Sequence, residues 1–327
     1  MSKNLKKVIC ENPFKHVTID AKGDVNFCCP DWNGFYSIGN LNEDSFSEIW
    51  VGEKARIFRK QFFENNYNIC KLDLCVKGEE CLIDEDVPPP KPKIVMFNYD
   101  ASCNQQCIFC RDGLFNKSEY PSFLQEDKID KLLEDLLENA DFVTPSTAGE
   151  CFFAPSSVLL IKKIAEKFPQ IKFSILSNGL LASKRMLEDL NITDKIRHFT
   201  VSLHTTNERT YNKMIRAGNF KKVMENIRYI SELKKNGIIE HFHLNFVVNS
   251  INYKEMPDFV KMATKLGAKA QFLELLDTNL PRPDYAELNI FDEKHKHHKD
   301  FCKRLNNKIF QSENCIMNEF TRSFSKK

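Results

Sequence analysis

From Ile94 onward the chain alternates short apolar segments with longer segments whose apolar residues recur at helical spacing. In residues 126–140, for example, Ile129, Leu133 and Leu136 fall on one face of a helix. Six predicted strands in succession, with helices between them, predict an α/β fold in which helices lie outside a parallel sheet. The predicted strands are 94–99, 141–147, 171–177, 197–203, 241–248 and 269–275, and the predicted helices are 126–140, 156–168, 183–190, 219–236 and 254–266.

A proline-rich run at residues 87–93, Val-Pro-Pro-Pro-Lys-Pro-Lys, marks the clearest boundary. Proline cannot continue a helix or donate to a sheet ladder, so the run predicts an extended linker. It separates a small Cys-rich α+β module at residues 1–86 from an α/β core at 94–280. A helical tail is predicted at 281–327.

The overall composition excludes some classes of protein. Mean hydropathy is -0.42 and no stretch approaches the roughly 20 apolar residues that span a bilayer. The basic N-terminus is not followed by an apolar segment, so we expect no signal peptide and a cytoplasmic protein with no membrane partner. The net charge of +2 is too small to indicate a basic surface for nucleic acid, so we expect the protein not to bind nucleic acid.

Twelve cysteines are an unusual number for such a chain, and nine of them lie within the first 110 residues. Because the cytosol keeps thiols reduced, they indicate metal binding or catalysis rather than disulfides. Cys103, Cys107 and Cys110 directly follow the first predicted strand of the core. Three thiolates on one loop can bind three irons of a four-iron cluster and leave the fourth iron open for a ligand. Half of a zinc site and chance clustering are the alternatives.

The CxxxCxxC spacing after the first strand of a parallel β-α series resembles the signature of the radical S-adenosylmethionine (SAM) superfamily. The resemblance covers residues 94 to about 280 and implies a partial (β/α)6 TIM-like barrel. It also implies that SAM chelates the open iron of a [4Fe-4S] cluster. An electron from a reductant such as flavodoxin or ferredoxin then cleaves SAM to methionine and a 5′-deoxyadenosyl radical, which abstracts hydrogen from a substrate.

The same resemblance assigns SAM contacts to residues at successive strand ends. They are Phe109 beside the last cysteine, Gly149 and Glu150 after the second strand, Asn178 after the third, Ser202 on the fourth, Arg216 beyond it, and, as weaker candidates, Asn245 and Phe272. His204 stands where related enzymes commonly have Asp. Each motif is short, so each residue also has a purely structural alternative. Gly149 would then only make a turn, and Ser202 would only cap a helix.

The N-terminal cysteines follow a second pattern. Residues 19–28 predict a hairpin with its turn at Gly23 and with Cys28 at its end. Together with the Ile-Gly-Asn at 38–40 and the Glu-Ile-Trp at 48–50, this resembles a SPASM or shortened "twitch" module. The resemblance implies one auxiliary [4Fe-4S] cluster, whose ligands would be Cys10, Cys28, Cys75 and Cys81, with Cys70 and Cys29 as alternates. A structural zinc site on the same thiolates is the alternative.

Two further features are open to more than one interpretation. Cys151 follows Glu150 and is a tentative catalytic residue, because a thiol facing the substrate can return a hydrogen atom; a small buried side chain is the alternative. The sequence His295-Lys-His-His298 resembles a metal motif, but its charged surroundings favour a solvated helix face.

The sequence therefore predicts a radical SAM oxidoreductase or maturase. Its substrate would be a peptide, a sugar or a small metabolite, and its reaction an oxidation, an epimerisation or a cross-link. The alternatives are a non-catalytic Fe–S electron carrier or redox sensor, and a zinc-binding interaction module fused to an α/β domain.

Overall fold

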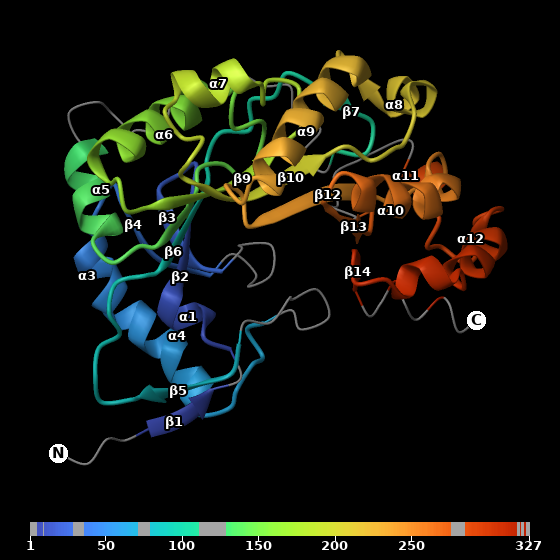
Figure 1. The fold of residues 1–327 in the computed structure, drawn as a ribbon. Helices are drawn as coiled ribbons and strands as arrows, with labels where there is room; N and C mark the ends of the chain where they lie inside the picture. The colour runs from blue at the N-terminus through green and yellow to red at the C-terminus, as the bar shows by residue number, and fades with distance from the viewer. Residues whose placement is uncertain are drawn as a thin grey trace. The chain divides into compact units, whose positions relative to one another are not determined.

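The structure is a computed structural model of the 327-residue chain. It describes residues 5–8, 10–28, 36–70, 79–110, 129–275 and 285–318, together with Thr321 and Phe324. Its elements are labelled in Figure 1. Two compact units are present: the first is Met1–Asp100, Ser118–Ala148 and Leu159–Phe173, and the second is Ala101–Lys117, Gly149–Val158 and Ser174–Lys327. Helix α6 (Pro155–Lys167) and strand β9 (Lys172–Ser177) run from one unit into the other.

The first unit contains a mixed sheet. In sheet order its strands are β8 (Phe142–Thr144), β6 (Ile94–Asn98), β2 (His16–Asp20), β3 (Asp24–Phe27) and β4 (Ser37–Asn40). Pairing is parallel from β8 to β2 and antiparallel from β2 to β4. The β2–β3 turn needs Gly23, whose φ of 84° lies in a region that L residues rarely adopt. The predicted N-terminal hairpin therefore forms and extends the sheet of the first strand–helix unit.

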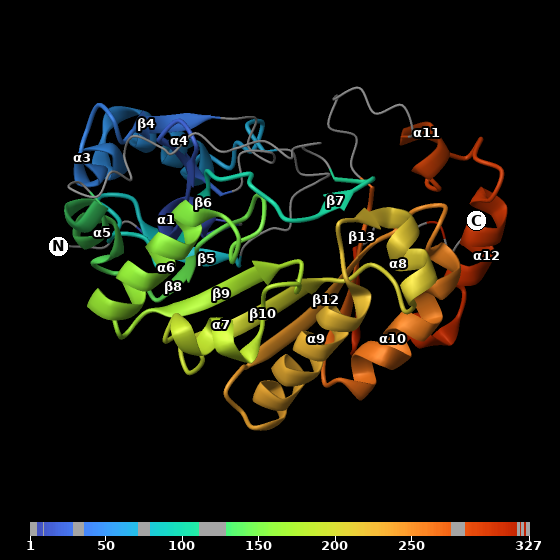
Figure 2. The same cartoon turned by 90° about the horizontal axis from the view of Figure 1, so that it is seen from above.

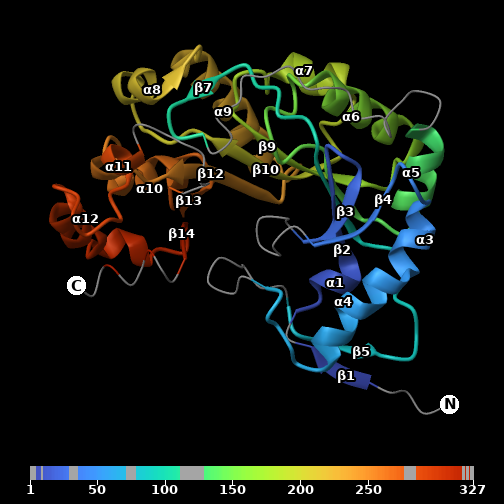
Figure 3. The same cartoon turned by 180° about the vertical axis from the view of Figure 1, so that it is seen from behind.

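Helices that lie wholly within this unit and a small antiparallel ladder complete its described part, as Figure 3 shows from behind. The helices are α1 (Asn12–Lys15), α3 (Phe46–Val51), α4 (Glu53–Phe63) and α5 (Ile129–Leu137), and the ladder joins β1 (Leu5–Val8) to β5 (Cys81–Asp84). Ser45 and Glu48 form a capping box that starts α3, in which each side chain satisfies a backbone N–H of the first turn.

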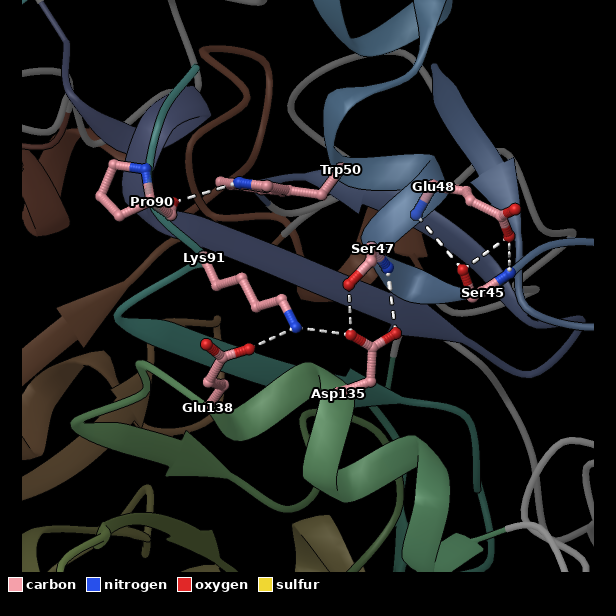
Figure 4. Close-up of polar contacts among 8 residues, drawn as sticks. All are labelled: Ser45, Ser47, Glu48, Trp50, Pro90, Lys91, Asp135 and Glu138. Carbon is pink, nitrogen blue, oxygen red and sulfur yellow. Dashed lines mark hydrogen bonds and ion pairs between the residues drawn. The ribbon is translucent and has the colours of Figure 1, made fainter. Parts of the chain in front are cut away.

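Helix α3 is tied to α5 and to the proline-rich run by the polar contacts in Figure 4. Asp135 on α5 accepts hydrogen bonds from the backbone N–H of Ser47 (3.0 Å) and from its hydroxyl. Lys91 bridges Asp135 and Glu138, at 2.6 Å from each carboxylate. The indole of Trp50 donates to the carbonyl of Pro90 at 3.1 Å. The predicted linker is thus packed against the helices of the first unit, and the compact units do not divide there.

The second unit is a parallel sheet with helices on one face. Its sheet order is β14 (Cys315–Met317), β13 (Lys269–Leu273), β12 (His241–Val247), β10 (Ile196–Ser202) and then β9. Figure 2 shows α9 and α10 lying along this sheet. Alternate residues such as Phe199, Leu244 and Phe246 are buried on the helix side and form its core.

The remaining elements of this unit are helical or very short. They are β7 (Gln106–Cys107), α7 (Lys184–Asp189), α8 (Glu208–Met214), β11 (Ile215–Arg216), α9 (Phe220–Lys235), η2 (Tyr253–Glu255), α10 (Met256–Lys265), α11 (Tyr285–Leu288), α12 (His298–Leu305) and η3 (Lys308–Gln311). The α/β class is confirmed. The tail contains a strand, β14, that the sequence did not predict. No helix among the described residues is long and apolar enough to cross a membrane.

Candidate active site

The cysteine loop is fixed in the second unit by a two-residue ladder. Strand β7 carries Cys107 and pairs antiparallel with β11, so that Cys107 lies opposite Ile215 and Gln106 lies opposite Arg216. The ladder continues through the N–H of Ile108, which donates to the carbonyl of Met214 at 2.9 Å. This pairing places the exposed Arg216 beside the cysteine loop.

The three thiols share one neighbourhood, because the charge of Cys110 acts on both Cys103 and Cys107. Burial raises the pKa of Cys107, and the charges of Cys110 and Cys103 raise that pKa further. Burial likewise raises the pKa of Cys103, and the charges of Glu150 and Cys110 raise that pKa further. Thiols in this environment stay protonated unless a cation replaces their protons, as iron does in a cluster. The donor set and its crowding therefore fit an iron–sulfur cluster.

Glu150 lies beside this loop as a fully buried carboxylate, 0% exposed. Its Oε1 accepts from the hydroxyl of Ser177 and its Oε2 from the N–H of Asn178, both at 2.6 Å. Its own N–H donates to the carbonyl of Ser102, the residue before Cys103, at 2.9 Å. Burial raises the pKa of Glu150 despite these bonds. Glu150 thus joins the end of β9 to the start of the cysteine loop.

Asn178 connects the same turn to the cysteines. Its Nδ2 donates to Oδ1 of Asn104 at 2.7 Å and lies 3.7 Å from Sγ of Cys103. The turn is completed by Gly179, whose φ of 79° requires glycine. Asn226 on α9 holds this turn, because its Nδ2 donates to the carbonyl of Gly179 at 2.8 Å. No sequence motif indicated Asn226, and only its burial on a helix could have pointed to it.

Gly149 has a φ of 62°, so the bend before Glu150 needs the freedom of glycine. Cys151, just after Glu150, is 1% exposed, and its thiol lies 3.9 Å from Oε1 of Glu150. That environment raises the pKa of Cys151 well above the usual value, mainly through burial. The placement is that of a packed, protonated thiol, and hydrogen-atom donation by Cys151 stays a prediction.

Ser202 and Asn245 are neighbours on β10 and β12, and Asn245 is in turn opposite Gln271 on β13. The Oδ1 of Asn245 is buried without a hydrogen-bond partner among the described residues, which leaves an acceptor for a ligand. Phe272 follows Gln271 and points to the opposite face. Its ring packs 5.3 Å from Phe246, in the core beneath α10, so its placement gives no support to the predicted nucleoside contact.

Phe109 and His204 meet edge to face, with ring centroids 4.8 Å apart. His204 has a φ of 65°, which is uncommon for a residue other than glycine. Its Nδ1 accepts from the N–H of Val247 at 3.0 Å, and burial lowers its pKa to about 3. His204 is therefore a neutral ring that supports Phe109 beside the last cysteine of the loop.

The first unit contains four of the N-terminal cysteines that the structure describes: Cys10, Cys28, Cys70 and Cys81. Pairing of Val8 with Cys81 brings the start of β5 close to Cys10, and the charge of Cys10 contributes to the raised pKa of Cys81. Cys28 ends the hairpin with a φ of 61°. The predicted ligand Cys75 and the alternate Cys29 lie outside the described residues.

The second unit also contains an open cleft of about 740 Å³. Two lysines, two histidines and one glutamate line it, namely Lys294, Lys296, His295, His297 and Glu287, and Ile108 of the cysteine loop forms part of its wall. His295 is positioned by a contact of its Nε2 with the carbonyl of Glu287 at 3.1 Å. The cleft thus combines positive charge with direct contact to the loop that carries Cys107 and Cys110.

The histidine motif at 295–298 is not a solvated face throughout. His298 is 6% exposed, and its Nδ1 contacts the carbonyl of Ile290 at 2.9 Å. Its Nε2 lies 3.3 Å from the thiol of Cys302. Within the described ranges no three His, Cys, Asp or Glu side chains converge to hold a single metal ion. His298 is therefore packed in the interior, whereas His295 and His297 line the cleft.

Comparison with known proteins adds several relatives. The chain is 24% identical over 181 residues to a probable GTP 3′,8-cyclase of Methanocaldococcus jannaschii, covering 53% of this chain and 56% of the relative. It is 28% identical over 199 residues to the GTP 3′,8-cyclase of Petrotoga mobilis, covering 58% and 59%. The chain thus matches rather more than half the length of these relatives.

Similar solved structures include Streptococcus suis SuiB bound to the precursor peptide SuiA. The likeness covers 98% of this chain and 75% of SuiB, with 13% identity and a TM-score of 0.49. Another is anSMEcpe with bound AdoMet, at 18% identity and a TM-score of 0.49, covering 69% of this chain and 63% of that one.

Two family models match the chain. Residues 10–75 match SPASM, an iron-sulfur cluster-binding domain, and residues 100–263 match the radical SAM superfamily. The SPASM match implies an auxiliary iron–sulfur cluster, and the radical SAM match implies a [4Fe-4S] cluster together with SAM. Since the second match covers half of the chain, the protein belongs to the radical SAM superfamily and carries a SPASM domain at its N-terminus.

Proposed function

We propose that the chain reductively cleaves SAM and uses the resulting radical to abstract hydrogen from a peptide, sugar or small-metabolite substrate. The observation that carries this proposal is the grouping of Cys103, Cys107 and Cys110 with Glu150 and Asn178 in one unit, at the ends of successive strands. In parallel sheets flanked by helices, ligands bind at the carboxyl ends of the strands.

The three thiolates would hold the cluster, which when bound would supply the electron that breaks a carbon–sulfur bond of SAM. Glu150 is fully buried, so its part is to position: it fixes Asn178, whose amide lies beside Cys103. Arg216 brings a positive charge to the cysteine loop that suits a carboxylate of SAM. Ser202 and the unpaired Oδ1 of Asn245 offer polar contacts for the nucleoside.

The test is SAM cleavage by the intact chain. The protein is purified without oxygen, reconstituted with iron and sulfide, reduced with dithionite and assayed for 5′-deoxyadenosine by mass spectrometry. We expect product from the wild type and none from the Cys103→Ala variant. The control is Cys302→Ala, since Cys302 packs against His298 and should leave product formation intact. An intact cluster that yields no 5′-deoxyadenosine would instead favour an electron carrier or a redox sensor.

For the substrate, we propose a molecule with a negatively charged group that enters the basic cleft. Lys294 and Lys296 supply positive charge beside a single carboxylate among the described lining residues, Glu287, and Ile108 joins the cleft to the cysteine loop. Arginine-free basic sites of this kind attract phosphate or carboxylate as point charges. GTP, named for the curated relatives, and acidic peptides are therefore the first substrates to try.

Transfer of hydrogen identifies the substrate. Each candidate is supplied in deuterated form, and deuterium in 5′-deoxyadenosine marks the one that loses hydrogen. With that substrate, Lys294→Glu should raise KM about tenfold and leave cleavage of SAM without substrate unchanged. The exposed Lys299→Glu is the matched control. A KM that responds equally to both variants would rule out recognition in the cleft.

A further inference from the structure

Arg59, on helix α4 of the first unit, is the most unusual charge in the described residues. It is 4% exposed, although arginine is almost never buried without a paired carboxylate. Its Nε donates to the carbonyl of Pro13 at 2.8 Å and its Nη1 to the carbonyl of Trp50 at 2.7 Å. Its Nη2 is buried without a hydrogen-bond partner among the residues that the structure describes.

Aromatic rings surround this guanidinium. Its carbon lies 4.1 Å from the ring centroid of Trp50, 4.6 Å from Phe27 and 5.9 Å from Phe14. Such contacts contribute favourably, but they do not neutralise a charge. Burial lowers the pKa of Arg59 to about 9, so the group keeps its proton at neutral pH. No carboxylate forms an ion pair with it in the part of the chain that the structure describes.

An unpaired buried charge is costly, and proteins retain one where a ligand or metal site compensates it. The surroundings of Arg59 indicate which group does so here. Phe27, whose ring contacts the guanidinium, immediately precedes Cys28, and Pro13, whose carbonyl binds Nε, follows Cys10 by three residues. Both segments that hold Arg59 therefore lead directly to predicted ligands of the auxiliary cluster.

The sign of the charge agrees with this placement. A four-iron cluster bound by four thiolates has a net negative charge, which becomes more negative by one when the cluster accepts an electron. A buried cation lowers the energy of both states and favours the reduced one more. The SPASM match at residues 10–75 includes Arg59 as well as both cysteines.

We propose that Arg59 is the counter-ion of the auxiliary iron–sulfur cluster, with Nη2 as the donor reserved for it, and that its charge raises the reduction potential of that cluster. Arg59 is a positioning and tuning residue that acts on the cluster and takes no part in SAM cleavage. The inference is independent of the substrate and of the reaction proposed above.

The test measures the potential of the auxiliary cluster alone. In full-length protein with Cys103, Cys107 and Cys110 changed to alanine, the auxiliary cluster is titrated with dithionite and followed by EPR, without SAM. Arg59→Met should shift its midpoint potential to more negative values, and Arg59→Lys, which keeps the charge, should shift it less. Arg56→Met removes an exposed charge from the same helix and should leave the potential unchanged.

The two possible failures are distinguishable. Arg59→Met could fold normally and yet hold no cluster. The proposal is then supported if its apoprotein has the same circular dichroism spectrum as the wild type and if Arg59→Lys still binds the cluster, because only cluster retention then depends on the charge. Loaded Arg59→Met with an unchanged potential overturns it, and so does an unfolded Arg59→Met apoprotein. Since neither measurement uses SAM, a failure here is separate from a failure of the proposed reaction.

Discussion

Replacing Glu150 tests whether the site is held together by one buried carboxylate. In Glu150→Ala the hydroxyl of Ser177 and the N–H of Asn178 both lose an acceptor 2.6 Å away. A hydrogen bond to a charged group contributes roughly 1.5–3 kcal/mol. Burial of the charge offsets part of that, as the raised pKa of Glu150 indicates. We expect Glu150→Ala to lower the free energy of unfolding by about 3 kcal/mol.

Glu150→Gln separates the charge from the shape. Its amide oxygen can accept from the N–H of Asn178 and its NH₂ can donate to Ser177 Oγ, so two neutral bonds replace two charge-assisted ones. Neutral bonds contribute roughly 0.5–1.5 kcal/mol each, which predicts a loss of about 2 kcal/mol. The exposed Glu166→Gln on α6 is the control and should change stability by less than about 0.5 kcal/mol.

The pH dependence gives an independent check. A carboxyl whose folded pKa is raised binds its proton more tightly in the folded state, so its stabilising contribution is present below the unfolded pKa and is lost as the pH rises through the folded pKa. The amide introduced by Glu150→Gln cannot titrate. The stability difference between wild type and Glu150→Gln should therefore be larger at pH 5 than at pH 8.

The assay is urea unfolding of the apoprotein, followed by circular dichroism at both pH values, because it requires neither cluster nor SAM. If Glu150→Ala lowers the free energy of unfolding by less than about 1 kcal/mol, the stabilising role assigned to the two short hydrogen bonds is refuted. A Glu150→Gln difference that grows between pH 5 and pH 8 would refute the raised pKa.

Two further predictions concern packing. Asp135→Ala, which removes both hydrogen bonds from Ser47, should cost about 2–3 kcal/mol in urea unfolding at pH 7. Because the pKa of Asp135 is lowered, that stability is present above its unfolded pKa and should disappear at pH values well below 4; an undiminished loss there would contradict the ion-pair account. Gly179→Ala places a Cβ 2.9 Å from Cγ1 of Val201 at a φ of 79° and should lower the melting temperature more than Gly237→Ala, which has a φ of 73° and open space. Equal effects would show that backbone strain alone matters.

The strands and helices of the second unit were predictable because their apolar periodicity is strong and their ends carry turn residues. Strand β14 was not, since Cys315–Met317 is only three residues long and shows no alternation. The β7–β11 ladder has two residues on each strand, so no period exists to detect. Its formation depends on a pairing between residues more than a hundred positions apart.

The site was predictable only as far as spacing and strand ends indicate it. Phe272 shows where this stops: the alternation in Lys269–Leu273 puts Phe272 on the buried face with Ala270, whereas its proposed nucleoside contact depended on the resemblance alone. The ring lies in the core, and its neighbour Gln271 lies opposite Asn245 instead. Asn226 was missed because its contact with Gly179 joins α9 to the turn after β9.

Two of the buried charges agree in sign with the two proposed cofactor sites, by a route that does not depend on cysteine spacing. Glu150 is a buried carboxylate that forms no ion pair with the described residues of the second unit, and Arg59 is a buried guanidinium without one among those of the first. Each charge would cost the empty chain several kcal/mol of stability if nothing opposite ever approached it. SAM is a cation at its sulfonium and its amino group, whereas a thiolate-bound cluster is an anion. Glu150 lies beside the cysteines proposed to hold the SAM-binding cluster, and Arg59 lies between segments that lead to proposed ligands of the auxiliary cluster. The sign of each buried charge is therefore opposite to that of the group proposed to bind there.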